Sequence, residues 1–400
     1  MKILQLCHKP PFPPVDGGAI AMNNISQGIL KAGHQLKIIS VATAKHPVDL
    51  KALGEEYLEK TQFESVFLDT SIKARAAFLN LFSSKSYNIE RFICPKLEAT
   101  IVAVLKEQSF DVVIFEGLFV TPYFRSVRAN SSAKMVLRAH NVEYKIWDRM
   151  SYNAHNPLKK AYLKLLSKRL KKFEVKTFKR MDGICAMTAI DAEIIQSECP
   201  SKKLAIIPSG YLIEKLTEVQ YKIKPEPQSI FHIASMNWQP NFEAVDWFLN
   251  QVWSQVIGEN NTARLYLAGR EMPKSLIQKA DEKIIIAGEV PDAKVFYLSK
   301  EIMIVPLLSG SGMRIKIIEG MALGKIIVST SIGAEGINCT HNKNILIADT
   351  PQEFANCLIK VLNDKEFCKT ISKNAQELIA NEYNNDLVCN QLFTFFNELN

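Results

Sequence analysis

The sequence predicts an α/β protein made of two Rossmann-like, doubly wound domains that face a cleft. Its 400 residues exceed what one hydrophobic core usually organises and suit two domains of ordinary size. Short apolar runs rich in β-branched residues alternate with segments of helical periodicity, which is typical of parallel sheets joined by crossover helices. Glycine-containing turns follow several of these runs, where such folds bind ligands.

The domain boundary is expected near a proline-containing segment of alternating charge, residues 221–228, which has the composition of a linker. We therefore expect a first domain over 1–220 and a second over 221–380. Residues 381–400 carry a further helical pattern.

The composition excludes several classes of protein. A hydrophobic content of 47% and a charged content of 22% are ordinary for a globular protein, and no apolar run approaches the ~20 residues of a membrane span. The N-terminal apolar stretch is too short for a signal peptide, so a cytoplasmic protein is expected. Eight scattered cysteines without a Cys-x-x-Cys pair favour free thiols over disulfides or zinc. The net charge of +8 suits anionic partners such as nucleotides or lipid headgroups, but no nucleic-acid motif is present.

The first domain opens with a strand, a loop and a helix. Lys2–Cys7 predicts a buried strand, Ala19–Lys31 carries a helical apolar stripe, and Gln35–Val41 predicts the second strand. The loop before the helix is stiffened by prolines and ends in Gly17 and Gly18, which let a ligand approach the backbone. The alternative is a structural loop of an ordinary α/β unit.

His140 is the most informative histidine. Strands are predicted at Asp111–Phe115 and from Met135 onward, and the second brings His140 to its carboxyl end beside Arg138. A histidine at a strand end can donate a hydrogen bond to a phosphate or sugar oxygen, although a lone histidine is also compatible with a structural role. Glu143 is a weaker candidate that can equally cap the next helix.

Residues 157–180 form a strongly basic segment in which Glu174 is the single acid and leucines are interleaved. The basic residues are Lys159, Lys160, Lys164, Lys168, Arg169, Lys171, Lys172, Lys176, Lys179 and Arg180. The pattern fits a basic amphipathic helix on an anionic membrane, so that a cytoplasmic protein would lie peripherally on the inner membrane face. It equally fits a solvated charged face on a helix that packs against its own domain.

The second domain repeats the alternation of strands and helices. The expected strands are Ser229–Ala234, Arg264–Ala268, Ile284–Ile286, Ile302–Val305 and Ile326–Val328. A helix is expected over Phe242–Val256, and two helical patterns follow Pro351, the last near Asn385–Leu399.

The sharpest signal is the Ser-Gly-Ser-Gly turn over 309–312, which joins a strand to a helix. Unpaired backbone N–H groups and the positive end of the helix dipole make such a turn an anion site. Arg314 and Lys316 lie in the first helical turn, where a cation costs roughly 0.3–1 kcal/mol unless an anion is bound. The alternative is an ordinary βαβ turn whose glycines serve packing.

Glu319 follows Lys316 by three residues and therefore shares its helix face. A carboxylate beside an anion loop can accept hydrogen bonds from the paired hydroxyls of a ribose. The alternative is a surface ion pair with Lys316. Phosphate and ribose recognition together indicate a nucleotide.

Residues 306–337 resemble the nucleotide-sugar motif of the family-4 glycosyltransferases, which have the GT-B fold. The resemblance is carried by Pro306-Leu307, the Gly-Ser-Gly turn, Lys316, Glu319 with its small-residue run, and Gly333-Ala334-Glu335-Gly336. Many members place a first Glu eight residues before the second, where this sequence has Ser311. The sequence is similar to a subset with a bare Gly-Ser-Gly turn.

The resemblance implies transfer of a sugar from a nucleotide-diphosphate donor to a hydroxyl of a glycan or lipid-linked acceptor, with retention of anomeric configuration. Cell-surface polysaccharide or glycolipid synthesis is the implied setting, and the last helix is expected to cross back to the first domain. The resemblance assigns His140, Arg314, Lys316 and Glu319 to catalysis. The donor-binding residues that it implies are Gly17, Gly18, Val290, Ser309, Gly310, Ser311, Gly312 and Met313.

Charge for the diphosphate is expected from the 314–319 segment. Many family members carry an Arg and a Lys near the loop over 235–241, and this sequence has neither there, so Arg314 and Lys316 are expected to replace them. No Asp-x-Asp pair or compact His/carboxylate set occurs, which favours catalysis without a metal and without a cofactor.

Other functions remain open from the sequence. A nucleotide-sugar epimerase of the same fold would turn over donor without an acceptor. A non-catalytic nucleotide-binding partner subunit would fit the missing first Glu. A Rossmann oxidoreductase is disfavoured, because no Gly-x-Gly-x-x-Gly follows the first strand.

Overall fold

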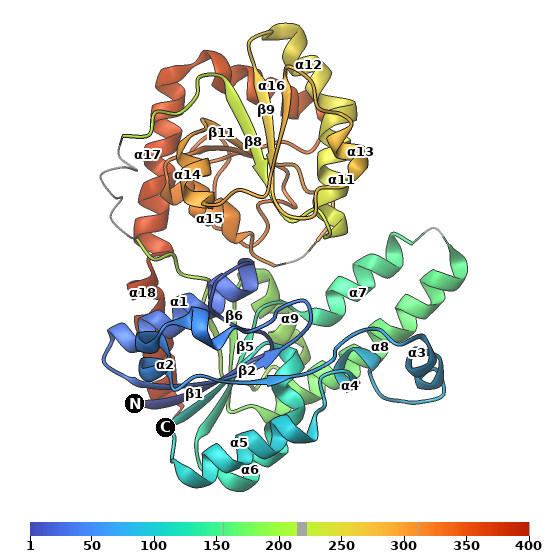
Figure 1. The fold of residues 1–400 in the computed structure, drawn as a ribbon, viewed down its shortest axis with the longest axis vertical. Coiled ribbons are helices and arrows are strands. Elements are labelled where there is room, and N and C mark those ends of the chain that lie inside the picture. Colours follow the sequence, from blue (N-terminus) through green and yellow to red (C-terminus); the bar gives the residue numbers. More distant parts are fainter. Residues whose placement is uncertain (155, 214–221, 311, 400) are drawn as a thin grey trace. The chain divides into compact units, whose positions relative to one another are not determined.

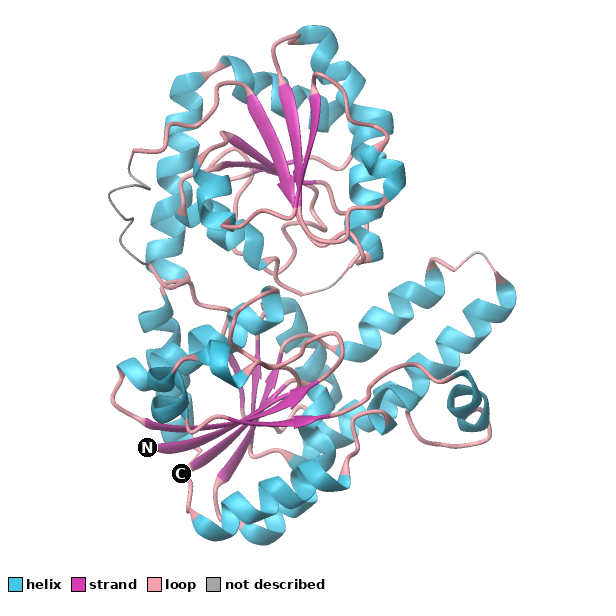
Figure 2. Ribbon diagram, in the orientation of Figure 1, coloured by secondary structure: helices cyan, strands magenta, loops and turns pink. Residues whose placement is uncertain are grey.

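The computed structural model describes residues 1–154, 156–213, 222–310 and 312–399, which form two compact α/β units. Unit 1 comprises Met1–Gly210 and Asn385–Asn400, and unit 2 comprises Tyr211–Asn384 (Figure 1). In each unit, helices surround one parallel sheet (Figure 2). The predicted pair of doubly wound domains is confirmed. The expected boundary between residues 220 and 221 lies outside the described residues.

The sheet of unit 1 has seven parallel strands in the order β3-β2-β1-β4-β5-β6-β7. They are β1 (Lys2–Cys7), β2 (Gln35–Ala42), β3 (Glu64–Phe67), β4 (Val112–Glu116), β5 (Lys134–Ala139), β6 (Gly183–Ala186) and β7 (Leu204–Ile206). The chain builds outward from β1 on one side and then restarts with β4 on the other. The carboxyl ends of β1 and β4 are therefore the switch point, where ligands bind in such sheets.

Unit 1 has helical segments that cover both faces of its sheet and one segment that buries no residue. They are α1 (Gly17–Lys31), η1 (Leu50–Leu53), α2 (Glu55–Thr61), α3 (Ala74–Asn80), α4 (Tyr87–Glu90), α5 (Pro95–Glu107), η2 (Leu118–Tyr123), α6 (Phe124–Asn130), α7 (Glu143–Tyr152), α8 (Pro157–Arg180), α9 (Ala189–Glu198) and α18 (Asn385–Glu398). The last helix, α18, packs beside α1 and buries Val388, Leu392 and Phe396 against the core of unit 1. Its expected return to the first domain is confirmed.

Helix α1 begins two residues earlier than expected. Asp16 is its N-cap, and the Asp16 side chain accepts a hydrogen bond from Ala19 N at 2.9 Å. Because a capping carboxylate satisfies an otherwise unpaired N–H group, it sets the helix start. Gly17 and Gly18 are therefore the first residues of α1, and their placement in the preceding loop was wrong.

The sheet of unit 2 has six parallel strands in the order β10-β9-β8-β11-β12-β13. They are β8 (Ser229–Ile233), β9 (Arg264–Ala268), β10 (Ile284–Gly288), β11 (Ile302–Val305), β12 (Ile326–Ser329) and β13 (Leu346–Ile347). The switch point lies between β8 and β11, where the strand order reverses as it does between β1 and β4 in unit 1.

The helices of unit 2 differ from expectation in two places. They are α11 (Gln239–Trp247), α12 (Trp253–Glu259), α13 (Lys274–Ile277), α14 (Ala293–Leu298), α15 (Ile315–Ala322), α16 (Pro351–Asn363) and α17 (Lys365–Glu382). The helix expected over Phe242–Val256 is divided by a π-helical turn at Phe248–Val252. Three helices rather than two follow Pro351, because the Asp364 side chain caps a new helix by accepting from Phe367 N at 2.9 Å. Within the described residues, no helix combines the length and apolarity that a bilayer crossing requires.

Candidate active site

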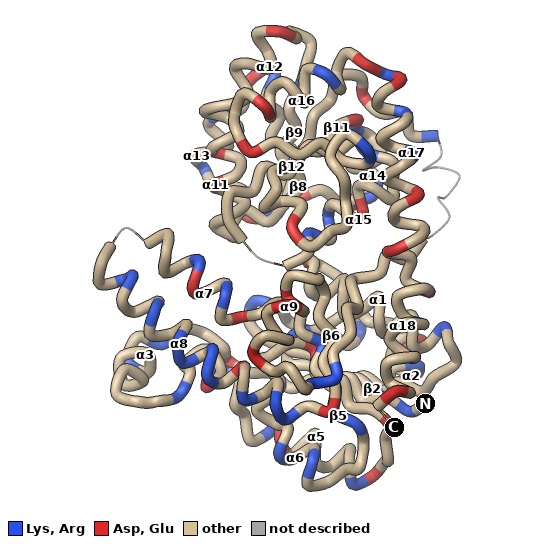
Figure 3. Tube along the Cα trace, turned by 180° about the vertical axis from the view of Figure 1, so that it is seen from behind, with Lys and Arg blue, Asp and Glu red and all other residues tan. Residues whose placement is uncertain are grey.

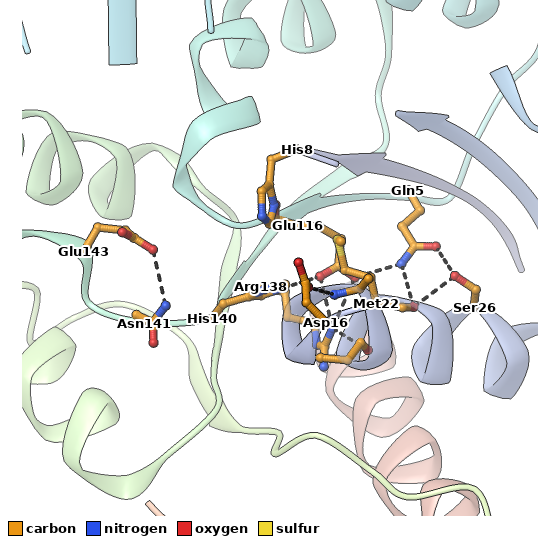
Figure 4. Close-up of polar contacts among 12 residues, drawn as sticks. Gln5, His8, Asp16, Met22, Ser26, Glu116, Arg138, His140, Asn141 and Glu143 are labelled. Atoms are coloured by element: carbon orange, nitrogen blue, oxygen red, sulfur yellow. Dashed lines mark hydrogen bonds and ion pairs between the residues drawn. The ribbon is translucent and has the colours of Figure 1, made fainter. Parts of the chain in front are cut away.

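In unit 1, three strands deliver polar side chains to the switch point (Figure 4). Glu116 ends β4 and is fully buried, Arg138 lies in β5 and is fully buried, and His140 directly follows β5. The Glu116 carboxylate accepts from Arg138 Nη1 at 3.0 Å, from His140 Nε2 at 2.6 Å and from Gln5 Nε2 at 2.8 Å. His140 was predicted from the sequence, whereas Glu116 was not.

Glu116 is a carboxylate throughout the physiological pH range. Burial alone would raise its pKa, but Arg138 and the hydrogen bonds from His140 and Gln5 outweigh burial and lower the pKa to about 2. A buried carboxylate with a guanidinium partner and two further donors is electrostatically complete. This network is therefore present before any substrate arrives.

The contact with Glu116 fixes the tautomer of His140. Since a carboxylate only accepts, Nε2 of His140 carries the proton in the hydrogen bond to Glu116. Burial lowers the pKa of His140 by more than Glu116 raises it, which favours the neutral ring. In that form, Nδ1 is an acceptor and can bind a sugar hydroxyl, whereas donation to a phosphate oxygen would need the charged ring.

His8 is a second histidine of this site that sequence reasoning missed. Its Nδ1 donates to Glu116 O at 2.7 Å, and its ring lies edge-on to that of His140 at a centroid distance of 5.6 Å. Burial and the neighbouring Lys9 lower the pKa of His8 to about 3, so the ring is neutral. A signal was available, because His8 directly follows β1 just as His140 directly follows β5.

The glycine pair has a structural explanation in the start of α1. A Cβ on Gly18 would lie 2.7 Å from Lys9 Nζ, and that ammonium pairs with Asp16 at 2.6 Å. Gly18 therefore keeps room for the ion pair that accompanies the helix cap. Donor binding by Gly17 and Gly18 stays a prediction.

Glu143 does not cap α7 with its side chain. It is the first residue of α7, and the cap comes from Glu174 of α8, which accepts from Glu143 N and Tyr144 N, each at 2.9 Å. Burial raises the pKa of Glu143 to about 7, and burial beside Glu143 raises the pKa of Glu174 to about 8. The single acid of the basic segment thus joins α8 to α7.

In unit 2, the turn after β11 closes around Arg314. Gly310 and Gly312 have φ angles of 127° and 80°, which favour glycine. A Cβ on Gly310 would lie 2.5 Å from Arg314 Nη2 and 3.1 Å from the Trp238 ring. Arg314 is the N-cap residue of α15, and its Nη1 donates to Gly312 O at 2.6 Å. Gly310 is thus required by the packing of the guanidinium, which lies 5.6 Å from the Trp238 ring centre, whereas Gly312 is favoured by its positive φ angle.

Lys316 lies in the first turn of α15 with its ammonium buried. Its Nζ atom is inaccessible to solvent and has no hydrogen-bond partner among the described residues. Burial and the nearby Arg314 lower the pKa of Lys316 to about 7. A buried ammonium without an acceptor is costly, and a bound anion would offset that cost.

Glu319 lies one turn further along α15. Burial raises its pKa to about 7, although the nearby Lys316 acts to lower it. Within the described structure no ion pair joins Lys316 to Glu319, so the alternative of a surface salt bridge is wrong. Neither group is therefore paired with the other.

His232 is a further residue that sequence reasoning missed. It lies in β8, and its Nδ1 donates to Ile304 O of β11 at 2.8 Å, across the switch point. Its Nε2 is buried and has no partner among the described residues. Burial and Lys316 lower the pKa of His232 to about 3, so Nε2 is an acceptor near the ammonium. The signal was a histidine among the apolar residues 230–233 of a strand.

The other expected donor residues lie near α15 to different degrees. Val290, in the loop after β10, and Met313 are half-buried against the same apolar cluster of unit 2. Ser309 Oγ donates to Glu243 Oε2 of α11 at 3.5 Å. Ser311 lies outside the described residues.

Residues 227–364 match the family described as Glycosyl transferases group 1. A curated relative, the "Uncharacterized 44.6 kDa protein in cps region" of Klebsiella pneumoniae, is 23% identical over 405 residues, covering 98% of this chain and 99% of that protein. The match to the family falls on the unit that carries Arg314, Lys316 and Glu319.

Solved structures share the fold over the full chain. Sucrose-phosphate synthase from Thermosynechococcus elongatus is similar with a TM-score of 0.73 at 13% identity, covering 100% of this chain and 99% of that one. HepE of Anabaena, solved with UDP, gives 0.68 at 15% identity and covers 100% of both chains. A G117R mutant of S. aureus TarM, solved with UDP, Fondaparinux and alpha-GlcNAc-glycerol, gives 0.68 at 13% identity, covering 99% of this chain and 100% of that one. The chain thus has two α/β units of the GT-B type, and its residues 227–364 match the glycosyl transferases group 1 family.

Proposed function

We propose that this enzyme transfers a sugar from a uridine diphosphate sugar to a hydroxyl of a glycan or lipid-linked acceptor, with retention of anomeric configuration. The observation that carries the proposal is the buried Nζ of Lys316, which has no partner among the described residues. An ammonium of this kind, at the N-terminus of an eight-residue helix, is complementary to a diphosphate.

The charge of the leaving group defines the catalytic task of unit 2. The bond between the anomeric carbon and the phosphate oxygen breaks, and its electron pair stays on the nucleoside diphosphate. A new bond joins the anomeric carbon to the acceptor oxygen, whose proton leaves on the released phosphate. Lys316, Arg314 and the Gly310 and Gly312 amides are assigned to the developing phosphate charge.

The nucleoside is assigned to Glu319 and its surroundings. The carboxylate of Glu319 accepts from the ribose hydroxyls, and Val290 contacts the base. The choice of uridine is supported by the relatives of similar fold, because HepE and TarM were solved with UDP. Ser309, Ser311 and Met313 complete the proposed donor set, together with Gly17 and Gly18.

His140 is assigned to the transferred sugar. Its neutral ring, held by Glu116 through Nε2, presents Nδ1 as an acceptor for a sugar hydroxyl. This assignment refines the expected donation to a phosphate oxygen, which the lowered pKa disfavours.

The proposed acceptor is an intermediate of cell-surface polysaccharide or glycolipid synthesis. The name of the Klebsiella relative, a protein in a cps region, supports this setting. A lipid-linked acceptor would bring the enzyme to the inner face of the membrane, in agreement with the ten cationic residues of α8.

A thermal-shift panel with UDP, GDP, ADP, TDP and CDP tests the nucleotide site. A specific ligand at ~100 times its dissociation constant adds roughly 2.7 kcal/mol of stability, and UDP is expected to give the largest shift. If none of the five nucleotides shifts the unfolding temperature, the proposed site is contradicted and a non-catalytic subunit is favoured.

Product analysis tests the reaction itself. The purified enzyme, UDP-sugar and a glycan acceptor are expected to give an α-linked product from an α-linked donor, read by NMR. EDTA is expected to leave the rate unchanged, because the proposal assigns charge neutralisation to Arg314 and Lys316. Donor turnover that needs no acceptor would point to an epimerase instead.

A further inference from the structure

Unit 1 carries an exposed apolar surface on and around α3. Helix α3 has no buried residue, and Phe78 and Leu79 on it are 60% and 58% exposed. Ile72 before it and Phe82 after it are 73% and 81% exposed. The α3 patch is defined here as Ile72, Phe78, Leu79, Leu81 and Phe82. Several large apolar side chains gathered in the open on one short segment mark an interaction surface.

Polar contacts to the main chain, rather than burial, hold the α3 patch in place. At its end, Arg169 of α8 donates from Nη1 to Asn80 O at 2.8 Å and from Nη2 to Leu81 O at 2.9 Å. Before its start, Arg91 Nη1 donates to Thr70 O at 2.7 Å. The segment is thus fixed at both ends with its apolar side chains outward.

The α8 helix beside the patch carries a row of cations. Lys164, Lys168, Lys172 and Lys176 recur every four residues, so they form one stripe, and all four are exposed. None of them has an ion-pair partner among the described residues. Figure 3 shows this basic helix next to α3.

The apolar stripe of α8 itself is not available to a partner. Leu163, Leu166, Leu170 and Phe178 are buried within unit 1. A membrane helix that lies flat on a bilayer would need that stripe to be exposed. The apolar contribution in this protein comes instead from the neighbouring α3 patch.

We propose that the α3 patch inserts into the interfacial region of an anionic bilayer while the α8 lysine stripe binds the lipid headgroups. This inference deepens the proposed function, since it rests on an acceptor held at a membrane. Charge complementarity favours lipid over other occupants: aromatic and aliphatic side chains would enter the acyl boundary, and unpaired lysines beside them would meet acidic headgroups.

Vesicle co-sedimentation of the full chain tests whether the α3 patch inserts into the bilayer. The wild type is expected to bind vesicles of phosphatidylcholine with phosphatidylglycerol, and not phosphatidylcholine alone. Phe78→Ser with Phe82→Ser is expected to lower the partition coefficient by at least about tenfold. Both side chains are exposed, so thermal unfolding should be unchanged. The matched control is Ile277→Ser, an exposed apolar position of unit 2, which should bind like wild type.

A triple charge variant tests whether the α8 lysine stripe binds the lipid headgroups. Lys164→Gln, Lys168→Gln and Lys172→Gln together are expected to lower binding on the order of 100-fold, and added salt should weaken the wild type. The control is Lys365→Gln, Lys369→Gln and Lys373→Gln on α17, which has the same spacing. Two of those lysines already pair with Glu366 and Glu377, so binding should be retained.

Three outcomes would overturn the proposal. The first is no binding of the wild type to phosphatidylglycerol vesicles, and the second is wild-type binding by the Phe78/Phe82 variant. The third is wild-type dimerisation in sedimentation velocity that the same variant abolishes, which would assign the patch to a second copy of this chain. The UDP thermal shift and transfer to a soluble acceptor are measured without vesicles, so failure of the proposed function is read separately.

Discussion

In unit 1, the buried Glu116 carboxylate meets Arg138 and His140, whereas in unit 2 the buried Lys316 ammonium has no partner among the described residues. Both sites lie at a switch point, and in both a histidine Nδ1 donates across it to a strand carbonyl, from His8 and from His232. The two units therefore share an architecture and differ in how their charges are balanced.

The difference is between a buried charge that is already paired within the protein and one that, in the proposed function, a bound diphosphate would pair. When one member of a buried ion pair is removed, the other charge stays buried without a partner, and the folded unit is destabilised. A charge left without a partner costs stability until an anion arrives. The same kind of substitution should therefore affect folding in unit 1 and binding in unit 2.

The largest expected effect is on the folding of unit 1. Glu116→Ala leaves the fully buried Arg138 without its anion and should lower the free energy of unfolding by about 3–5 kcal/mol. Urea unfolding followed by circular dichroism measures the loss. Glu116→Leu combined with Arg138→Met should recover much of it, because no unpaired charge remains.

The control for this substitution is an exposed ion pair of the same unit. Glu56→Ala breaks the pair with Lys60 on the surface of α2 and should leave unfolding unchanged. If Glu116→Ala behaves like Glu56→Ala, unit 1 does not depend on its buried pair and the contrast fails.

The second effect falls on binding and catalysis rather than folding. Lys316→Met keeps the side-chain length without the charge, and should lower the transfer rate by about 10²–10³-fold. The free energy of unfolding should be unchanged or higher, since an unpartnered buried ammonium is removed. Steady-state kinetics and urea unfolding on one preparation measure both quantities.

Lys325 provides the matched control within unit 2. It is also buried, but its Nζ donates to Lys300 O at 2.8 Å and to Leu298 O at 3.3 Å. Lys325→Met should therefore lower stability and leave UDP affinity intact. A Lys316→Met enzyme that keeps its activity, or that loses stability as Lys325→Met does, would remove Lys316 from the donor site.

The sequence predicted most of what is local. Apolar runs and glycine turns placed the strands, His140 and the 314–319 segment, because each signal lies within a few residues. The pairing of Glu116 with Arg138 joins two strands, and the Glu174 cap on Glu143 of α7 reaches 31 residues back along the chain, so neither was predicted. The start of α1 was predictable, because Asp16 precedes Ala19 by a capping distance. Whether Lys316 has a partner depends on the whole fold.

A smaller effect is expected at the ribose. Glu319→Gln removes the charge and keeps the shape, so UDP affinity should fall by roughly 10- to 100-fold, the range of a hydrogen bond to a charged group. The specific readout is discrimination between UDP and 2′-deoxy-UDP by calorimetry. Wild type should prefer UDP and Glu319→Gln should prefer neither. An unchanged preference would assign the ribose to other residues.

The smallest effect is a pH dependence that only the unpaired site should show. Burial lowers the pKa of Lys316 and raises that of Glu319, each to about 7. As pH rises above this value Lys316 loses the proton that binds phosphate, and as pH falls below it Glu319 gains a proton and loses its charge. UDP affinity should therefore peak near neutrality and decline by up to about tenfold per pH unit on either side.

The alkaline and acid sides of the pH profile of UDP affinity can each be tested with one variant. Lys316→Met should flatten the alkaline limb, because no ammonium remains to titrate. Glu319→Gln should reduce the acid limb to what the terminal phosphate of UDP contributes, which titrates near pH ~6 in phosphate monoesters. Glu116 has a pKa lowered to about 2 by Arg138 and its hydrogen bonds against the effect of burial, so it stays charged across this range. A flat wild-type profile would mean that Lys316 and Glu319 hold fixed charges without ligand, and that the contrast between the two units is smaller than the buried ammonium indicates.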